Sequence, residues 1–337
     1  MADVIEPWQV LDTCLRVELQ HDRVEVECTL AVRSAGGTAV PLVLDGRSLV
    51  THSIEIDGSP AGERASLAER TLEVQLPEGD HTIRTRVSAA VGAPGDKGFV
   101  SYAGLLSTNL EPQGFRRLTW FPDRPSIRST FDVTLVGSPE VFPAMRANGV
   151  AAERGVLDDG RAWVRFIDPV AKPSYLFAIV AGALEQRTAT HRTLSGRDIA
   201  LTVLAPPDLV SGAGFALWAM NEVMSFDELQ GGIEHDLDES VHVAVPGYPD
   251  ATEYHGLMFF DPSLLIADPR GHTDDDLLLI AANVAHEYGH HVRGNRVTVS
   301  SWAELPLKEG LTVLTAQNDF RRHMFGDSAR VLDVLDL

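Results

Sequence analysis

The stretch TDDDLLLIAANVAHEYGHH, residues 273–291, decides how the second half of the chain folds. Thr273, followed three residues later by Asp276, forms a capping-box pattern, and acidic side chains in a first turn favour a helix N-terminus. The apolar residues recur at helical spacing and predict one buried face: Leu277, Ile280, Ala281, Val284 and Tyr288. The sequence therefore predicts an amphipathic helix that ends in the pattern H-E-x-x-H.

This pattern has the residue types of a metal centre. His286 and His290 are four positions apart, so on a helix their imidazoles lie on one face and can reach one ion. Glu287 lies beside them and can act as a general base toward water at the metal. Catalytic zinc usually takes three protein ligands. Glu309 follows His290 after eighteen intervening residues, near the start of a second predicted helix over about 305–320, and could complete a His₂Glu set. The alternative is a solvated helix turn that matches the pattern by chance.

Composition narrows the functional classes. A chain of 337 residues with 44% hydrophobic residues suits about two globular domains. Its formal net charge of −20 argues against nucleic acid and anionic membranes as partners. Cys14 and Cys28 are the only cysteines, which excludes a disulfide framework and suits a reducing compartment, although one bridge between them stays open. Without a secretory signal pattern or an apolar run long enough to span a bilayer, we expect a cytoplasmic protein.

The first half of the chain has the patterning of β-structure. Residues 17–32 alternate apolar and polar side chains on both sides of a polar turn, which predicts a hairpin. Residues 71–76 and 81–87 repeat this arrangement across the turn residues PEGD and predict a second hairpin. Further strands are expected at 129–137, 162–168, 174–182 and 198–206, and a helix at 215–229. The patterning changes after about residue 187, which predicts a domain boundary there.

The run from LLIADPRGHTDDD through HEYGHHVRGNRVTVSSWAELPLKEGLTVL resembles the zinc aminopeptidases of the aminopeptidase N family, especially their bacterial branch. The resemblance implies one Zn²⁺ per chain, with ligands His286, His290 and Glu309 and with Glu287 as general base. It also implies an α+β fold, in which an N-terminal antiparallel β-sandwich or saddle domain (1–187) precedes a thermolysin-like zinc-metallopeptidase domain (188–337). The implied function is release of N-terminal amino acids from peptides by attack of metal-activated water.

The same resemblance suggests how a substrate would be held. Glu253, in DATEYHGLMFF, falls on the family glutamate that binds the free α-amino group of a peptide. Glu111, in STNLEPQGFRRLTW, falls on a second amine-binding acidic position, and Asn109 stands where the bacterial branch usually has Gln. The stretch around Glu253 departs from the family pattern at Asp250, Thr252 and Tyr254.

Two features lead us to expect an incomplete catalytic domain. Family members carry a later tyrosine that stabilises the oxyanion of the tetrahedral intermediate, and no tyrosine follows Tyr288 here. The final residues, SARVLDVLDL (328–337), have an apolar helical pattern, so self-association or a missing C-terminal segment is expected. The alternatives are a zinc-binding relative, weak or inactive, that binds peptide N-termini or needs a partner chain, and a zinc hydrolase with a non-peptide substrate.

Overall fold

The computed structural model describes residues 7–34, 40–268 and 270–326, and these form two compact units. Unit 1 comprises the chain up to Gly182 together with Ser300–Trp302, and unit 2 comprises Ala183–Val299 and the chain from Ala303 onward. The boundary expected after residue 187 falls inside β16 (Glu185–Arg192) of unit 2. The apolar face expected within residues 328–337 lies outside the described residues.

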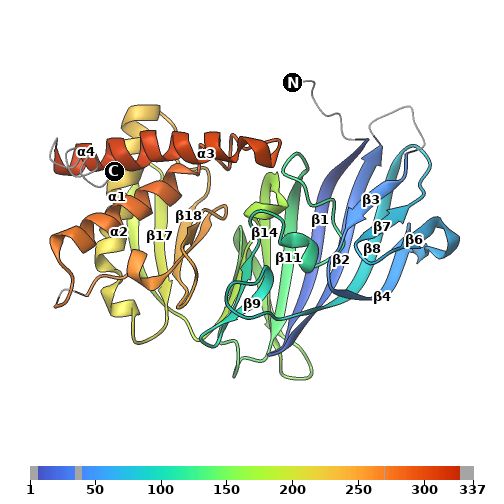
Figure 1. Cartoon of the computed structure of the whole chain (residues 1–337). Coiled ribbons are helices and arrows are strands. Elements are labelled where there is room, and N and C mark those ends of the chain that lie inside the picture. The colour runs from blue at the N-terminus through green and yellow to red at the C-terminus, as the bar shows by residue number, and fades with distance from the viewer. Residues whose placement is uncertain (1–6, 35–39, 269, 327–337) are drawn as a thin grey trace. The chain divides into compact units, whose positions relative to one another are not determined.

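Unit 1 is built almost entirely from strands (Figure 1). Its largest sheet has eight strands in the order β13-β14-β11-β1-β2-β8-β4-β5. Their bounds are β1 Trp8–Leu19, β2 Arg23–Ser34, β4 Leu49–Ile56, β5 Ser59–Pro60, β8 Asp80–Ala90, β11 Arg128–Gly137, β13 Val150–Val156 and β14 Ala162–Pro173. A four-stranded sheet has the order β12-β15-β10-β9, with β9 Gly98–Tyr102, β10 Leu105–Asn109, β12 Ala144–Ala147 and β15 Ile179–Gly182. A three-stranded sheet has the order β3-β7-β6, with β3 Leu42–Asp45, β6 Ala65–Leu67 and β7 Thr71–Val74.

Pairing in unit 1 confirms one hairpin and corrects two expectations. β1 and β2 pair antiparallel, and the alternating residues of β2 are buried, as predicted. The second predicted hairpin is wrong: β7 pairs with β3 and β6, whereas β8 pairs with β2 and β4 in another sheet. The unit is also not purely antiparallel, because β1 pairs in parallel with β11. Alternation shows which residues of a strand are buried, but it does not identify the neighbouring strand.

Unit 2 combines a mixed sheet with helices (Figure 1). The sheet has the order β16-β17-β18-β20-β19, with β17 Asp198–Ala205, β18 Glu239–Ala244, β19 Ala251–Thr252 and β20 Leu257–Phe260. The helices are α1 Gly214–Gly231, α2 Asp274–Gly289, α3 Leu305–Thr312 and α4 Asp319–Phe325, with a π-helical stretch at Val313–Asn318. The second helix predicted from sequence is therefore interrupted by π-turns and continues to Phe325. Residues of α1 and α2 share one hydrophobic core with the sheet.

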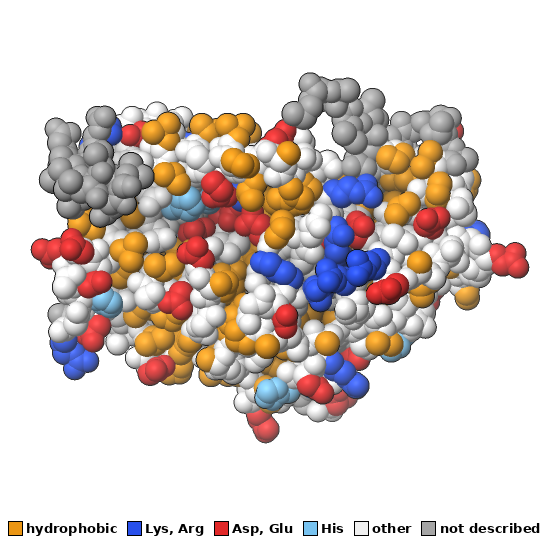
Figure 2. Space-filling model, in the orientation of Figure 1, with side chains coloured by type: hydrophobic (Ala, Val, Ile, Leu, Met, Phe, Trp, Pro, Cys, Tyr) orange, Lys and Arg blue, Asp and Glu red, His pale blue; other side chains and the backbone are white. Residues whose placement is uncertain are grey.

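Three expectations from composition can be compared with the structure: those about net charge, about the two cysteines and about membrane-spanning segments. Figure 2 shows Lys and Arg side chains gathered on the visible face of unit 1, so the net negative charge is unevenly spread. Cys14 and Cys28 are both free thiols, so the bridge between them does not form. Among the described residues, no helix is both long and apolar enough to cross a membrane.

Candidate metal centre

Helix α2 fixes the first half of the centre. Its N-terminus has the predicted capping box: the Thr273 hydroxyl accepts the Asp276 backbone N–H, and the Asp276 carboxylate accepts the Thr273 N–H at 2.7 Å. The predicted apolar face is buried, with Ile280, Val284 and Tyr288 at most 1% exposed. His286 lies in the last turn, and His290 is the C-cap residue immediately after the helix. Burial of this face thus fixes the direction in which both imidazoles point.

Close packing then brings the third residue to the histidines. Gly289 faces the helical segment that follows Leu305, and a Cβ at this position would lie 2.1 Å from the Cβ of Ala316. Only glycine allows the two helices to approach this closely. Glu309 lies one turn into α3, and Pro306 occupies the first turn of that helix, where proline is tolerated.

The three predicted ligands converge. His286 Nε2 lies 3.0 Å from His290 Nε2, and the Glu309 carboxylate lies 3.4 Å from His286 Nε2 and 3.3 Å from His290 Nε2. Zinc bonds of about 2.0–2.2 Å in a tetrahedral site separate ligand atoms by about 3.3 Å. The donor set and its spacing therefore fit one zinc ion, with a fourth position left for water or substrate.

The ring of His290 is oriented by its other nitrogen. Nδ1 donates to the backbone carbonyl of Arg293 at 3.0 Å, and the Thr312 hydroxyl lies 3.2 Å from the same nitrogen. A Cβ at Gly294 would lie 2.9 Å from Nδ1, so this glycine also keeps the ring in place. Because Nδ1 carries the proton in this arrangement, Nε2 is the nitrogen available to a metal.

Charge around Glu309 favours its ionised form. Burial alone would raise the pKa of its carboxyl, but the polar contacts with the His286 and His290 rings and the nearby charge of Lys308 hold that pKa well below its usual range. Glu287, the predicted general base, is 5% exposed and stands next to His286 on α2.

Glu253 contacts a lysine that the sequence analysis did not single out. It is 3% exposed, and the Lys308 ammonium pairs with its Oε1 and lies 3.2 Å from Glu309 Oε1. The carboxylate oxygens of Glu253 and Glu309 lie within 4.8 Å of one another. Burial would raise the pKa of Glu253, but the charge of Lys308 and its hydrogen bond to the carboxylate lower it. The one signal in the sequence was that Lys308 directly precedes the candidate ligand Glu309. This signal is weak, because a lysine on a short helix ordinarily has a solvated side chain.

The other two predicted substrate contacts belong to unit 1. Asn109 ends β10 and is buried; its amide accepts from Lys97 Nζ at 2.8 Å and donates to the carbonyl of Asp96 at 2.9 Å. Glu111 lies two residues further on, where its charge acts on the ammonium of Lys97. Contact of either residue with a substrate stays a prediction.

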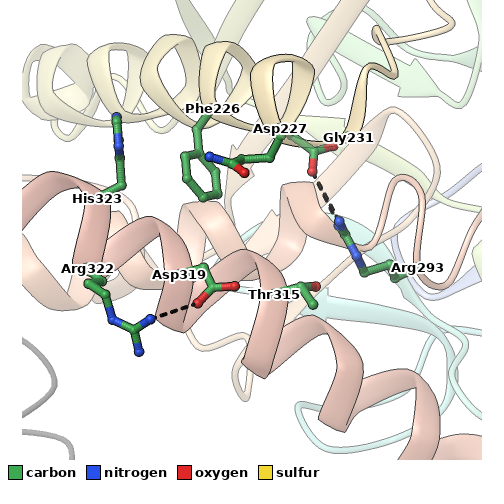
Figure 3. A pocket seen from close by; sticks show the side chains of 9 residues that line it. Phe226, Asp227, Gly231, Arg293, Thr315, Asp319, Arg322 and His323 are labelled. Atoms are coloured by element: carbon green, nitrogen blue, oxygen red, sulfur yellow. Dashed lines mark hydrogen bonds and ion pairs between the residues drawn. The ribbon is translucent and has the colours of Figure 1, made fainter.

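A pocket of about 570 Å³ opens on unit 2, lined by Phe226, Asp227, Gln230, Gly231, Arg293, Thr315, Asp319, Arg322 and His323. Figure 3 shows Arg293 reaching toward Asp227 and Arg322 toward Asp319, at 3.4 and 3.5 Å. None of the predicted site residues lines this pocket. It borders the metal centre at Arg293, whose carbonyl accepts a hydrogen bond from His290.

Comparison with known proteins agrees with this geometry. Residues 215–332 match the peptidase family M1 domain, and residues 101–176 match the peptidase M1 N-terminal domain. Aminopeptidase N of Caulobacter vibrioides is 40% identical over 92% of this chain, and aminopeptidase N of Escherichia coli is 33% identical over 92%. The chain spans 36% of the length of each of these relatives.

A solved structure indicates the same protein family. The chain is similar to Legionella pneumophila aminopeptidase A in complex with aspartic acid, with a TM-score of 0.92 and 32% identity over 98% of this chain and 40% of that chain. The predicted α+β class, with a β-rich N-terminal part before a peptidase domain, is confirmed. The family predicted by resemblance is also confirmed: the chain belongs to peptidase family M1.

Proposed function

We propose that this chain carries the metal centre of a zinc-dependent aminopeptidase that releases N-terminal amino acids from peptides. The observation that carries the proposal is the convergence of His286, His290 and Glu309 at zinc-ligand spacing, with Glu287 buried beside them. The similar proteins are named aminopeptidases, and the Legionella protein is described with aspartic acid, which carries a free α-amine. Both support a substrate with a free N-terminus.

The residues divide the chemistry among them. Bound zinc would polarise the scissile carbonyl and lower the pKa of a water molecule. Glu287 would accept the proton of the attacking water and deliver it to the departing amine. Glu253 would bind the α-ammonium, because Lys308 keeps its carboxylate ionised and a carboxylate accepts several donors. We propose that Glu111 and Asn109 assist there, on the basis of their sequence context.

Hydrolysis of aminoacyl chromogenic substrates tests this function. Glu287→Gln keeps the size of the side chain and removes the base, so kcat should fall by about 10²–10⁴ while metal content stays at the wild-type level. Asp275→Asn on the exposed first turn of the same helix is the matched control and should keep both kcat and metal. Equal, background-level hydrolysis by the wild type and Glu287→Gln, with metal bound in both, would instead support a protein that only binds peptide N-termini.

We also propose a cytoplasmic location, supported by the two cysteines, which are free thiols rather than a disulfide. Cell fractionation with immunodetection tests it. The chain should appear in the cytosolic fraction, and recovery from an extracytoplasmic fraction would contradict the proposal.

A further inference from the structure

A second cluster of metal-binding side chains lies at the end of α2, outside the centre described above. His235 and Asp236 belong to the connection between α1 and β18, His291 directly follows His290, and His255 precedes β20. All three histidines are buried: His291 is 1% exposed, His235 is 0% exposed and His255 is 1% exposed.

The potential donor atoms of the cluster are close together. One atom each from His235, Asp236 and His291 lies within 4.8 Å of the other two. Asp236 Oδ1 is 3.1 Å from His291 Nε2 and 3.9 Å from His255 Nε2. The rings of His235 and His291 have centroids 4.3 Å apart, and the ring of His255 stacks on that of His291 at 5.6 Å. All four side chains therefore surround one small volume.

Several of these atoms are buried without a hydrogen bond. Among the described residues, His235 Nδ1, both ring nitrogens of His291 and Asp236 Oδ1 have no hydrogen-bond partner. The 3.1 Å contact between Asp236 and His291 does not have the geometry of a hydrogen bond. Buried polar atoms without partners destabilise a fold, and native proteins rarely keep several of them together. A cation among these atoms would satisfy all of the facing ones at once.

The remaining atoms of the cluster orient it. Arg296 Nε donates to Asp236 Oδ2 at 2.9 Å, which leaves Oδ1 directed at the histidines. The Nε2 atom of His235 lies 3.4 Å from the carbonyl of Glu239, which leaves Nδ1 toward His291. Histidines that bind metals commonly use one ring nitrogen for the ion and the other for a backbone carbonyl. Histidines that only pack against one another would not need one polar atom bonded to the protein and the other directed at the centre of the cluster.

We propose that His235, Asp236 and His291 form a second divalent-cation site, with His255 as the fourth side chain facing the ion. Two or three imidazoles with one carboxylate suit Zn²⁺ or a similar transition metal rather than Mg²⁺ or Ca²⁺, which prefer oxygen ligands. The site joins the α1–β18 connection to the residue that directly follows His290. It therefore serves to hold the end of α2, and with it the orientation of His290, in place.

Counting metal ions separates the two sites. After gel filtration in zinc-free buffer, elemental analysis should find two zinc ions per wild-type chain and one in His286→Ala. His235→Gln should also hold one, and the double variant none. His242→Phe is the matched control, because His242 is equally buried but belongs to no group of metal-binding residues in the described part of the chain; it should hold two.

The outcomes are distinguishable from failure of the proposed function. One ion in the wild type that persists in His235→Gln would overturn the second site and leave the aminopeptidase proposal intact. One ion in the wild type that persists in His286→Ala and disappears in His235→Gln would support the second site and overturn the zinc centre of the proposed aminopeptidase.

If His235→Gln does not fold, His286→Ala decides, since its histidine cluster is unaltered. Metal-free His286→Ala should take up one Zn²⁺ and melt at a higher temperature when it does so, because a ligand that binds only the native state stabilises it. Absence of both effects would overturn the second site.

Discussion

Replacing Gly289 by alanine tests whether close packing of two helices assembles the metal centre. The new Cβ would lie 2.1 Å from the Cβ of Ala316, whereas carbon atoms in contact stay about 3.5–4.0 Å apart. Helix α2 and the segment after Leu305 must therefore separate by about 1.5 Å. Overpacking of this kind costs about 1–3 kcal/mol, and the higher helix propensity of alanine offsets about 1 kcal/mol. Since the overlap is deep, we expect a net loss of about 1–2 kcal/mol, which lowers Tm by about 2–8 °C.

The same displacement should release the metal. His286 lies on one of these helices and Glu309 on the other, 3.4 Å apart, and a metal site tolerates about 0.2 Å of error in its bond lengths. Thermal unfolding followed by circular dichroism, with elemental analysis of the same sample, measures both effects. Gly310→Ala is the matched control: it lies in α3 with open space around its Cβ position, so alanine should stabilise the protein by up to about 1 kcal/mol. A Gly289→Ala protein that melts at or above the wild-type temperature with its metal retained would refute the packing argument.

Three further predictions concern other residues. Burial lowers the pKa of His242 to about 3, so the stability that its neutral form contributes is fully present above pH ~6.5 and is lost as pH falls toward 3. His242→Phe should flatten this part of a plot of unfolding free energy against pH, and an unchanged slope would contradict the assignment. Thr312→Val should weaken zinc binding about 10–100-fold, because the Thr312 hydroxyl helps to hold the ring of His290. Thr315→Val is the control, because the Thr315 hydroxyl donates to the carbonyl of Leu311, and it should leave zinc binding unchanged. Equal zinc affinities of the two variants in a competition titration would count against the orienting role of Thr312. The Cys14 side chain is exposed at the surface, but partial desolvation of its thiol and the hydrogen bond that it donates to Asp12 raise its pKa. At pH 8 this thiol should therefore be alkylated more slowly than a thiol with an ordinary pKa, and equal labelling rates would contradict the assignment.

Features encoded by local sequence were predictable. Helix α2 has its cap, acidic first turn and apolar face within one continuous stretch, and the structure reproduces all three. The spacing from His290 to Glu309 placed a carboxylate near the start of a second helix, and this is where it meets the histidines. In both cases the relevant interactions join residues that are near in sequence or on two consecutive helices.

Features that depend on distant residues were not predictable. The turn between β7 and β8 looks like a hairpin turn, but the two strands enter different sheets because their partners come from elsewhere in the chain. No motif in the sequence singles out Lys308, because its partner Glu253 lies far away along the chain and only the fold brings the two together. The cluster around His291 draws on three separate loops, so no spacing in the sequence could reveal it.

We propose that His286, His290 and Glu309 hold one zinc ion beside Glu287. An anomalous-difference map from crystals measured just above the zinc absorption edge tests it most directly. We predict a peak about 2.0–2.2 Å from His286 Nε2, His290 Nε2 and a Glu309 carboxylate oxygen. A map from zinc-supplemented crystals with no peak among these three side chains would contradict the account.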